Sequence, residues 1–287
     1  MGRGHVGPDA VIGLLHPGEM GAALAMQLRR GRPVLWASSG RSVETIRRAE
    51  QAGLRDVVTV EELAESSDVL LSVCPPHAAL AVAESIAGFE GIYVDANAVS
   101  PMTAREIASV VEESGAQFVD GGILGPPPRD GVPTSLYLSG TLAPAVADLF
   151  RDTAIRARVV SDEPGSASAV KMAYAAWTKG TTALLLAIQA LARAEGVEAA
   201  LVEEWQESIP DLPERSRRAA LVAGRKGWRF AGEMDEIAST FAAAGLPDGF
   251  HRAAAEIYRR SPALGDVAAD EALDRALAAL LDDGSEP

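Results

Sequence analysis

The chain has little cysteine and no long uncharged apolar segment. Its only cysteine among 287 residues is Cys74, which excludes an intramolecular disulfide and a cysteine metal cluster. No apolar run is long enough to span a bilayer, and no secretory apolar region follows residues 1–10. We therefore expect a cytoplasmic protein with no membrane partner.

Basic residues are also scarce relative to acidic ones. Lysine and arginine number 26 against 40 aspartates and glutamates, which gives a formal net charge of −14. This balance argues against nucleic acid and anionic membrane surfaces as general partners. The histidines (His5, His16, His77 and His251) show no metal-ligand spacing, so we expect no metal site.

Strand and helix patterns alternate through the first half of the chain. Apolar strand patterns occur at residues 11–15, 34–37, 69–73, 92–95, 118–120, 136–138 and 158–160. Helical patterns occur at residues 42–52, 77–87, 103–114 and 144–153, and Ser100-Pro101 is a plausible cap and first-turn proline for the third of these. Such alternation is typical of a doubly wound α/β domain with a mostly parallel sheet.

The pattern changes after Asp162. Residues 166–195 are rich in alanine and leucine and predict one long helix, and further helical patterns occur at 198–207, 212–223, 233–244 and 248–260. No strand pattern follows Asp162, and the turn residues 162–165 mark the boundary. The chain is thus predicted to have an α/β domain over residues 9–162 and an all-α domain over residues 163–282.

A glycine-containing turn joins the first strand to the first helix. Gly18 and Gly21 match the last two glycines of G-x-G-x-x-G, and His16 occupies the place of the first. Gly18 would let the backbone approach a pyrophosphate, which the helix N-terminus also attracts. We therefore predict a Rossmann-type cofactor-binding domain, although an ordinary strand–turn–helix is the alternative. The expected cofactor-binding residues of the turn are His16, Pro17, Gly18, Glu19 and Met20.

The end of the second predicted strand favours NADP over NAD. An acidic residue normally accepts a hydrogen bond from the ribose 2′-hydroxyl of NAD at this place, but residues 36–42 contain no carboxylate. Ser38 and Ser39 can donate hydrogen bonds, and Arg41 can pair with a 2′-phosphate. The alternative is that Arg41 is a solvated residue of the next helix.

The start of the long predicted helix carries a lysine in an apolar stretch. Lys171, Tyr174 and Thr178 follow i, i+3 and i+7 spacing and share one helical face. Partial burial beside a nicotinamide would help Lys171 act as a proton donor. The alternative is a lysine that extends to solvent from a packed helix.

Three motifs in order resemble the β-hydroxyacid dehydrogenases, which include 3-hydroxyisobutyrate dehydrogenase and 6-phosphogluconate dehydrogenase. Residues 12–21 resemble the family turn I-G-x-I-G-L-G-x-M-G, and residues 120–125 resemble the substrate loop D-x-P-V-S-G-G. Residues 165–171 keep the spacing G-x-G-x-x-x-K, with Ala167 in place of the second glycine. Residues 226–234 resemble a subgroup whose C-terminal domain has no assigned function.

The resemblance implies an NADP-dependent oxidoreductase that moves a hydride between nicotinamide and a small hydroxy acid or carbonyl substrate. Lys171 would be the general acid/base, with Tyr174 beside it, and the backbone of Gly121, Gly122 and Ile123 would hold a substrate anion. The further residues expected along the cofactor are Cys74, Pro75, Pro76 and Asn97.

The chain departs from the family pattern after the lysine. Ala175 occupies the place of the usual asparagine, so either Tyr174 or Thr178 supplies that hydrogen bond or the substrate differs. Residues 226–234 are predicted to begin a helix near the active site, where Arg229 pairs either with a substrate anion or with Glu233.

Two alternative functions remain at this point. Imine reductases share this architecture but usually carry aspartate or tyrosine at the lysine position, and a non-catalytic NADP-binding protein would tolerate the incomplete motifs. The long alanine- and leucine-rich helix has more apolar surface than one chain easily covers, so we also expect a homodimer.

Overall fold

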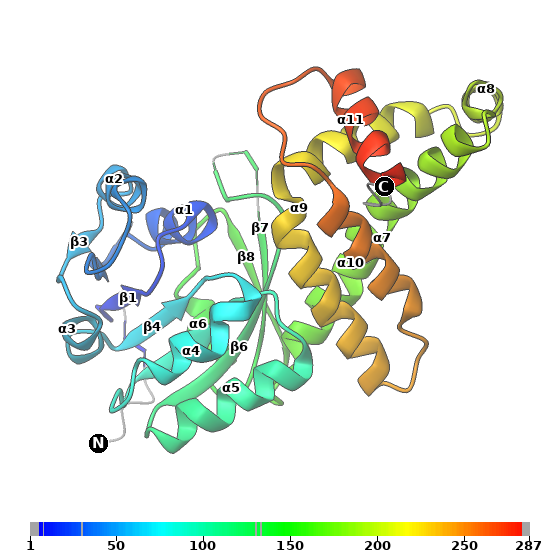
Figure 1. The fold of residues 1–287 in the computed structure, drawn as a ribbon. Helices are drawn as coiled ribbons and strands as arrows, with labels where there is room; N and C mark the ends of the chain where they lie inside the picture. The colour runs from blue at the N-terminus through cyan, green and yellow to red at the C-terminus, as the bar shows by residue number, and fades with distance from the viewer. Residues whose placement is uncertain (1–5, 8, 30, 130, 133, 283–287) are drawn as a thin grey trace. The chain divides into compact units, whose positions relative to one another are not determined.

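The computed structural model describes residues 6–7, 9–29, 31–129, 131–132 and 134–282. It consists of two compact units, Met1–Met172 and Ala173–Pro287 (Figure 1). The first unit ends inside a helix, ten residues beyond the change of pattern that we placed after Asp162. In the described part of the chain, no helix is long and apolar enough to cross a membrane.

Unit 1 contains a sheet whose described strands follow the order β3-β2-β1-β4-β5-β6-β7-β8. All neighbouring strands pair in parallel except β6 and β7, which are antiparallel. The first six positions match the 3-2-1-4-5-6 order of dinucleotide-binding folds. The strands are β1 (Ile12–Leu14), β2 (Val34–Trp36), β3 (Arg55–Asp56), β4 (Val69–Ser72), β5 (Ile92–Asp95), β6 (Gln117–Leu124), β7 (Thr134–Ser139) and β8 (Ile155–Ser161).

Helices cover both faces of this sheet, as the alternating pattern predicts. Residues of α1, α2 and α6 pack with Ile12 and Leu14 in one apolar core, and residues of α3, α4 and α5 pack with Leu35 and Leu70 in the other. Figure 1 shows α4 and α5 together on one side of the strands. The helices are α1 (Glu19–Leu28), α2 (Val43–Gln51), α3 (Val60–Glu65), the 3-10 turn η1 (Pro76–Ala78), α4 (Ala79–Glu84), α5 (Pro101–Glu113) and α6 (Ala143–Asp148).

Local signals explain where several of these elements begin. Ser100 accepts a hydrogen bond from the Thr103 backbone N–H at 3.1 Å, and Pro101 occupies the first turn of α5, so this predicted cap is confirmed. The sequence argument missed β3 and α3. Both residues of β3 are exposed, so apolar periodicity could not indicate it.

The described residues of unit 2 form helices joined by turns and loops, with no strand among them, so the predicted α/β plus all-α fold class is confirmed. The helix α7 begins in unit 1, and its residues from Ala173 onward belong to unit 2. The remaining helices pack around α9, mainly α10 and α11. The bounds are α7 (Ser166–Ala194), α8 (Glu198–Ser208), α9 (Leu212–Ala243), α10 (Gly249–Arg260) and α11 (Ala269–Leu281).

The predicted break between residues 223 and 233 is wrong, because α9 continues through it. Two glycines in this segment serve close packing. A Cβ on Gly224 would lie 2.6 Å from the Leu264 side chain, and one on Gly227 would lie 3.2 Å from the Tyr258 carbonyl oxygen. Arg229 therefore lies within α9 and does not mark the start of a helix.

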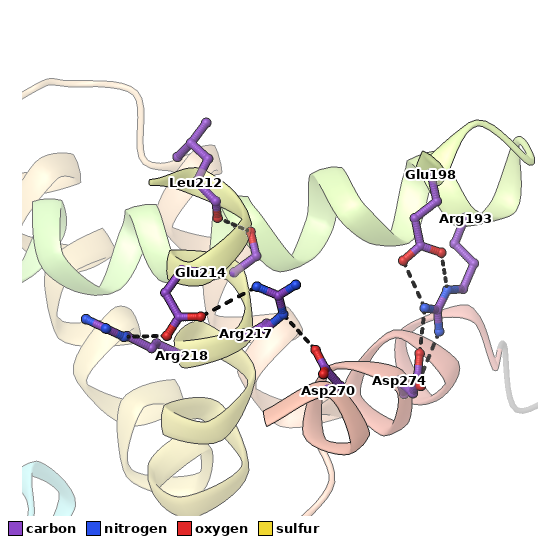
Figure 2. Close-up of polar contacts among 9 residues, drawn as sticks. Arg193, Glu198, Leu212, Glu214, Arg217, Arg218, Asp270 and Asp274 are labelled. Atoms are coloured by element: carbon purple, nitrogen blue, oxygen red, sulfur yellow. Dashed lines mark hydrogen bonds and ion pairs between the residues drawn. The ribbon is translucent and has the colours of Figure 1, made fainter. Parts of the chain in front are cut away.

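The sequence argument also missed α11, whose buried residues are mainly alanines. Ion pairs connect this helix to its neighbours, as Figure 2 shows. Arg193 of α7 pairs with Asp274 at 2.8 Å and with Glu198 of α8 at 2.9 Å. Arg217 of α9 pairs with Asp270 at 2.6 Å.

Candidate functional site

The turn after β1 has the geometry of a phosphate-binding turn. Gly18 is the N-cap of α1, and no described atom lies within 4 Å of the place where its Cβ would be. The helix N-terminus is therefore open to a close ligand. A Cβ on Gly21 would lie 2.5 Å from the His16 carbonyl oxygen, so α1 can approach the turn this closely only with glycine there.

Two nitrogen atoms beside this turn are buried without a hydrogen-bond partner among the described residues. They are Nδ1 of His16 and Nε of Arg41. The Nη2 atom of Arg41 donates to the Leu15 carbonyl oxygen at 3.2 Å, so this side chain lies against the turn and is not a solvated helix residue. Burial and the Arg41 charge lower the pKa of His16 to about 4, which keeps its imidazole neutral.

A polar cofactor group would satisfy both nitrogens. Burial also lowers the pKa of Arg41 from its usual value, and an anion would offset that effect. The residues present thus fit a dinucleotide whose phosphates lie at the start of α1.

Two charged residues near this turn were missed by the sequence argument. Arg48 of α2 donates to the Pro17 carbonyl oxygen at 3.4 Å and pairs with Glu44 at 2.6 Å. Asp56 of β3 accepts hydrogen bonds from the backbone N–H groups of Ser38 at 3.2 Å and Val58 at 2.8 Å. A carboxylate therefore lies at the end of β2, where we expected none, because it comes from the neighbouring strand.

The loop after β4 is held by one buried amide side chain. Asn97 Oδ1 accepts from the Cys74 backbone N–H at 2.5 Å. Its Nδ2 atom donates to Ser72 Oγ at 3.1 Å and to Asp95 Oδ1 at 2.5 Å. Both amide hydrogens of Asn97 are thereby used within the protein, so this side chain has the geometry of a loop support. Direct contact of Asn97, Pro75 or Pro76 with a cofactor stays a prediction.

Cys74 is a protonated thiol in this environment. Burial, followed by the nearby Asp95 carboxyl, raises its pKa to about 12. A thiol of this kind is a poor nucleophile.

The predicted substrate segment Gly121–Ile123 is not a loop but the end of β6, where it pairs with Leu136–Leu138 of β7. The strand extends further than predicted because the antiparallel pairing with β7 continues it. On the other side, the β5 pairing stops at Asp95 and Asp120. Among the described strands, residues 121–124 therefore pair with β7 alone, and Asp95 and Ala96 at the end of β5 lie close to Gly121.

Lys171 lies against this end of β6. Its Nζ atom donates to the Ile123 carbonyl oxygen at 2.8 Å, and its side chain is half-buried. The close approach depends on Gly122, whose Cβ would lie 2.7 Å from the Ala167 carbonyl oxygen and 3.0 Å from Lys171 Cβ. The structure thus brings together the predicted lysine and the predicted substrate segment.

The buried carboxylate of Asp120 anchors the start of α7. It accepts hydrogen bonds from the backbone N–H groups of Gly165 at 3.0 Å and Ser168 at 2.9 Å. It also accepts from the hydroxyls of Ser168 at 2.6 Å and Ser139 at 2.9 Å. A carboxylate at a helix N-terminus is favourable, and this one places the turn that precedes Lys171.

The other predicted substrate residues belong to unit 2. Tyr174 is half exposed, and Thr178 Oγ1 donates to the Tyr174 carbonyl oxygen at 3.3 Å. Arg229 Nε donates to Glu233 Oε1 at 3.0 Å, and Lys179 pairs with the other carboxylate oxygen at 2.8 Å. The Glu233 partner that we considered for Arg229 is therefore present, and the substrate roles of these residues stay predictions.

No group of three or more potential metal ligands occurs among the described residues. His5 lies outside them.

Both parts of the chain match known protein domains. Residues 10–134 match the NAD binding domain of 6-phosphogluconate dehydrogenase, and residues 192–261 match a domain of unknown function, DUF1932. Residues 10–134 therefore form a domain of the 6-phosphogluconate dehydrogenase NAD-binding type, and the C-terminal part of the chain carries a DUF1932 domain. Its first domain is an NAD(P)-binding domain.

Similar proteins support the same architecture. An uncharacterized 28.5 kDa protein of Methanothermus fervidus is 29% identical over 198 residues, which cover 69% of this chain and 76% of the relative. The solved structure of MTH1747, a conserved protein of unknown function with structural similarity to 3-hydroxyacid dehydrogenases, is 29% identical, with a TM-score of 0.67 and coverage of 93% and 99%. Mycobacterium tuberculosis 3-hydroxyisobutyrate dehydrogenase with L-serine shares the fold at 16% identity, a TM-score of 0.72 and coverage of 95% and 99%.

Proposed function

We propose that this protein is an NADP-dependent oxidoreductase that acts on a small hydroxy acid or the corresponding semialdehyde or keto acid. The observation that carries the proposal is the contact between Lys171 Nζ and the Ile123 carbonyl oxygen at 2.8 Å. It places a half-buried ammonium group at the C-terminal end of a sheet whose strand order is that of dinucleotide-binding folds, and ligands bind at that end.

The residues around the glycine turn would hold the cofactor, which supplies the hydride when bound. The N–H groups at the start of α1 would bind its phosphates, with His16 and Arg41 completing their hydrogen bonds on it. Arg41 favours NADP because a guanidinium pairs with a 2′-phosphate. Asp56 also lies at this end of β2, but its carboxylate already accepts from two backbone N–H groups.

Lys171 would hold the proton that the carbonyl oxygen of the substrate takes up during reduction. The Ile123 carbonyl oxygen accepts one ammonium hydrogen, which orients the group toward this end of β6. In the reverse direction, the neutral amine would remove the hydroxyl proton. A substrate carboxylate is proposed to bind beside Lys171 at this end of β6, close to the Gly121–Ile123 segment. Tyr174 and Thr178 are proposed as additional hydrogen-bond donors to the substrate.

The test combines cofactor binding with a substrate panel. The full-length protein is first titrated with NADPH and NADH, and nicotinamide absorbance is then followed with short hydroxy acids, semialdehydes and cyclic imines. Turnover of imines alone would replace this proposal with an imine reductase. Tight NADPH binding without turnover of any compound would favour a non-catalytic NADP-binding protein.

Substitution of the lysine gives the sharper result. General acid catalysis contributes roughly 10²–10⁴-fold, so Lys171→Met should lower kcat by about that factor and change the NADPH Kd little. Arg151→Met is the control, since Arg151 is an exposed cationic residue of unit 1 that pairs with Asp148 at 2.6 Å, outside the proposed site. Near-normal turnover of the Lys171 variant on the true substrate would show that the lysine is structural.

We also propose a homodimer formed through α7. Trp177, Leu184 and Leu191 recur every seven residues on this helix and are 67%, 42% and 63% exposed. A seven-residue apolar repeat is the pattern that pairs one helix with another. A second copy of the chain would cover this row.

A further inference from the structure

A row of buried polar side chains crosses four neighbouring strands of unit 1 and begins at the C-terminal ends of β4 and β5. Ser72 of β4, Asp95 of β5, Asp120 of β6 and Ser139 of β7 are consecutive register partners. Each of the four has 0% exposure. Two carboxyl groups thus lie side by side on neighbouring strands, away from solvent.

Hydrogen bonds connect this row everywhere except at its centre. Asn97 Nδ2 joins Ser72 to Asp95, and the Ser139 hydroxyl donates to Asp120. Between the two carboxyl groups, Asp95 Oδ2 is buried and has no hydrogen-bond partner within the described residues. A buried acceptor without a donor is costly, so the observed row requires an explanation at this atom.

The two carboxyl groups have unequal surroundings. Asp120 accepts four hydrogen bonds, three from Gly165 and Ser168 at the start of α7 and one from Ser139 of β7. Asp95 accepts from Asn97 alone among the side-chain contacts described. Burial and the neighbouring Asp120 raise the pKa of Asp95 to about 7. The other titratable groups near Asp95 are the uncharged thiol of Cys74, after β4, and phenol of Tyr93, in β5.

We propose that Asp95 is a positioning residue that works as a protonated carboxyl group. A proton on Oδ2 converts the unsatisfied acceptor into a donor beside anionic Asp120, while Oδ1 continues to accept from Asn97. Through Asn97, Asp95 then holds the backbone of Cys74 and the loop that follows it. The inference rests on the proposed function in one respect, because that loop is assigned to the cofactor.

The row connects the two halves of the proposed site in unit 1. Asp120 holds the start of α7, which carries Lys171, and Asn97 holds the loop after β4. Ionisation of Asp95 would place a second anion beside Asp120 and weaken both supports. A single proton would therefore keep the cofactor loop and the lysine helix in place together.

Cys74 provides a direct test because it is the only thiol in the chain and its backbone N–H is the group that Asn97 binds. The full-length protein is labelled with a small maleimide at about pH 6, where Asp95 is expected to be protonated. Asp95→Asn keeps an acceptor and a donor, so its labelling rate should match that of the unmutated protein. Asp95→Ala should label roughly tenfold faster, the effect expected from loss of about one buried hydrogen bond.

Two further variants keep this test decisive. Asn97→Ala should label as fast as Asp95→Ala, and it replaces that variant if the latter does not fold. Gln27→Ala is the matched control, since Gln27 is buried and its side chain accepts from the Ala154 backbone N–H elsewhere in unit 1. It should leave labelling unchanged. Fast labelling of Asp95→Asn, or slow labelling of both alanine variants at Asp95 and Asn97, would overturn the proposal.

The dependence of NADPH affinity on pH separates this inference from the proposed function. As pH rises through about 7, the unmutated protein should bind NADPH more weakly, while Asp95→Asn should show no change in that range. Equal pH dependence in both proteins would overturn the role of the Asp95 proton. Absence of NADPH binding in every variant would instead refute the proposed function, and Cys74 labelling would still decide the role of Asp95.

Discussion

The buried carboxyl group of Asp95 should make unit 1 less stable as pH rises toward neutrality. Its folded-state pKa of about 7 lies above the unfolded value of roughly 3.9. Between these values the folded protein retains a proton that the unfolded chain has lost, so the contribution is complete below about pH 4 and disappears as pH rises through 7. Asp95→Asn cannot ionise and removes this dependence.

The size of the effect follows from the same two values. At about 1.36 kcal/mol per pH unit, the unmutated protein should lose up to about 4 kcal/mol relative to Asp95→Asn between pH 4 and pH 8. Because the chain has two compact units, a single unfolding curve would mix their transitions. Hydrogen exchange of peptides covering β5 and β6 under increasing urea isolates the relevant unit.

The comparison needs one control and has one clear refutation. Glu90→Gln removes an exposed carboxylate from the same unit and should follow the unmutated protein at every pH. If the stability difference between the unmutated protein and Asp95→Asn stays constant within about 1 kcal/mol from pH 4 to pH 8, Asp95 is not the buried acid that its surroundings indicate.

Three further predictions concern the cofactor, the assembly and α9. NADPH should bind more tightly than NADH, and Arg41→Ala should weaken NADPH binding by about 1.5–3 kcal/mol with little effect on NADH in calorimetric titrations; equal Kd values in the unmutated protein would contradict this. Leu184→Glu should convert a dimer to a monomer in light scattering, and an unmutated protein of monomeric mass at micromolar concentration would refute the interface. Gly224→Ala should destabilise the protein by about 1–3 kcal/mol because its Cβ would meet Leu264 at 2.6 Å. Gly232→Ala, in an open position of the same helix, should instead stabilise it by up to about 1 kcal/mol, as thermal unfolding would show.

The order of elements in unit 1 was predictable because apolar strands and amphipathic helices alternate there. Each strand buried on both faces appears as a short apolar run, and parallel strands require helical connections. The exceptions are elements without that signal. β3 has two exposed residues, and the end of β6 contains Gly121 and Gly122, which resemble a loop in sequence. Pairing with β2 and with β7, respectively, makes these segments strands.

Glycine residues occupy different kinds of position in the two units: the turn at Gly18 in unit 1 and the interior of a helix in unit 2. Gly18 was correctly taken as part of the turn that follows the apolar run of β1, whereas Gly21 lies inside α1 and permits its close approach to His16. In α9, a break was predicted between residues 223 and 233, yet Gly224 lies against Leu264, 40 positions later, and Gly227 lies against Tyr258 of α10, 31 positions later. A single sequence does not show which partner a helical glycine faces, so this error could not be avoided by propensity alone.

For the candidate site, the order of the strands was predictable from the sequence, but the register between neighbouring strands was not. The carboxyl ends of parallel strands meet at one edge of a sheet, so the glycine turn, the loop after β4 and the end of β6 were expected to converge. Asp95 follows apolar residues of β5, and Asp120 follows apolar residues of β6. Only the register between these two strands shows that the two aspartates are neighbours. A shift of one residue in that pairing would turn one of them to the opposite face. The proton that we propose on Asp95 therefore depends on the register of β5 against β6. If the two strands paired in a register that separated these carboxyl groups, the proton would not be needed.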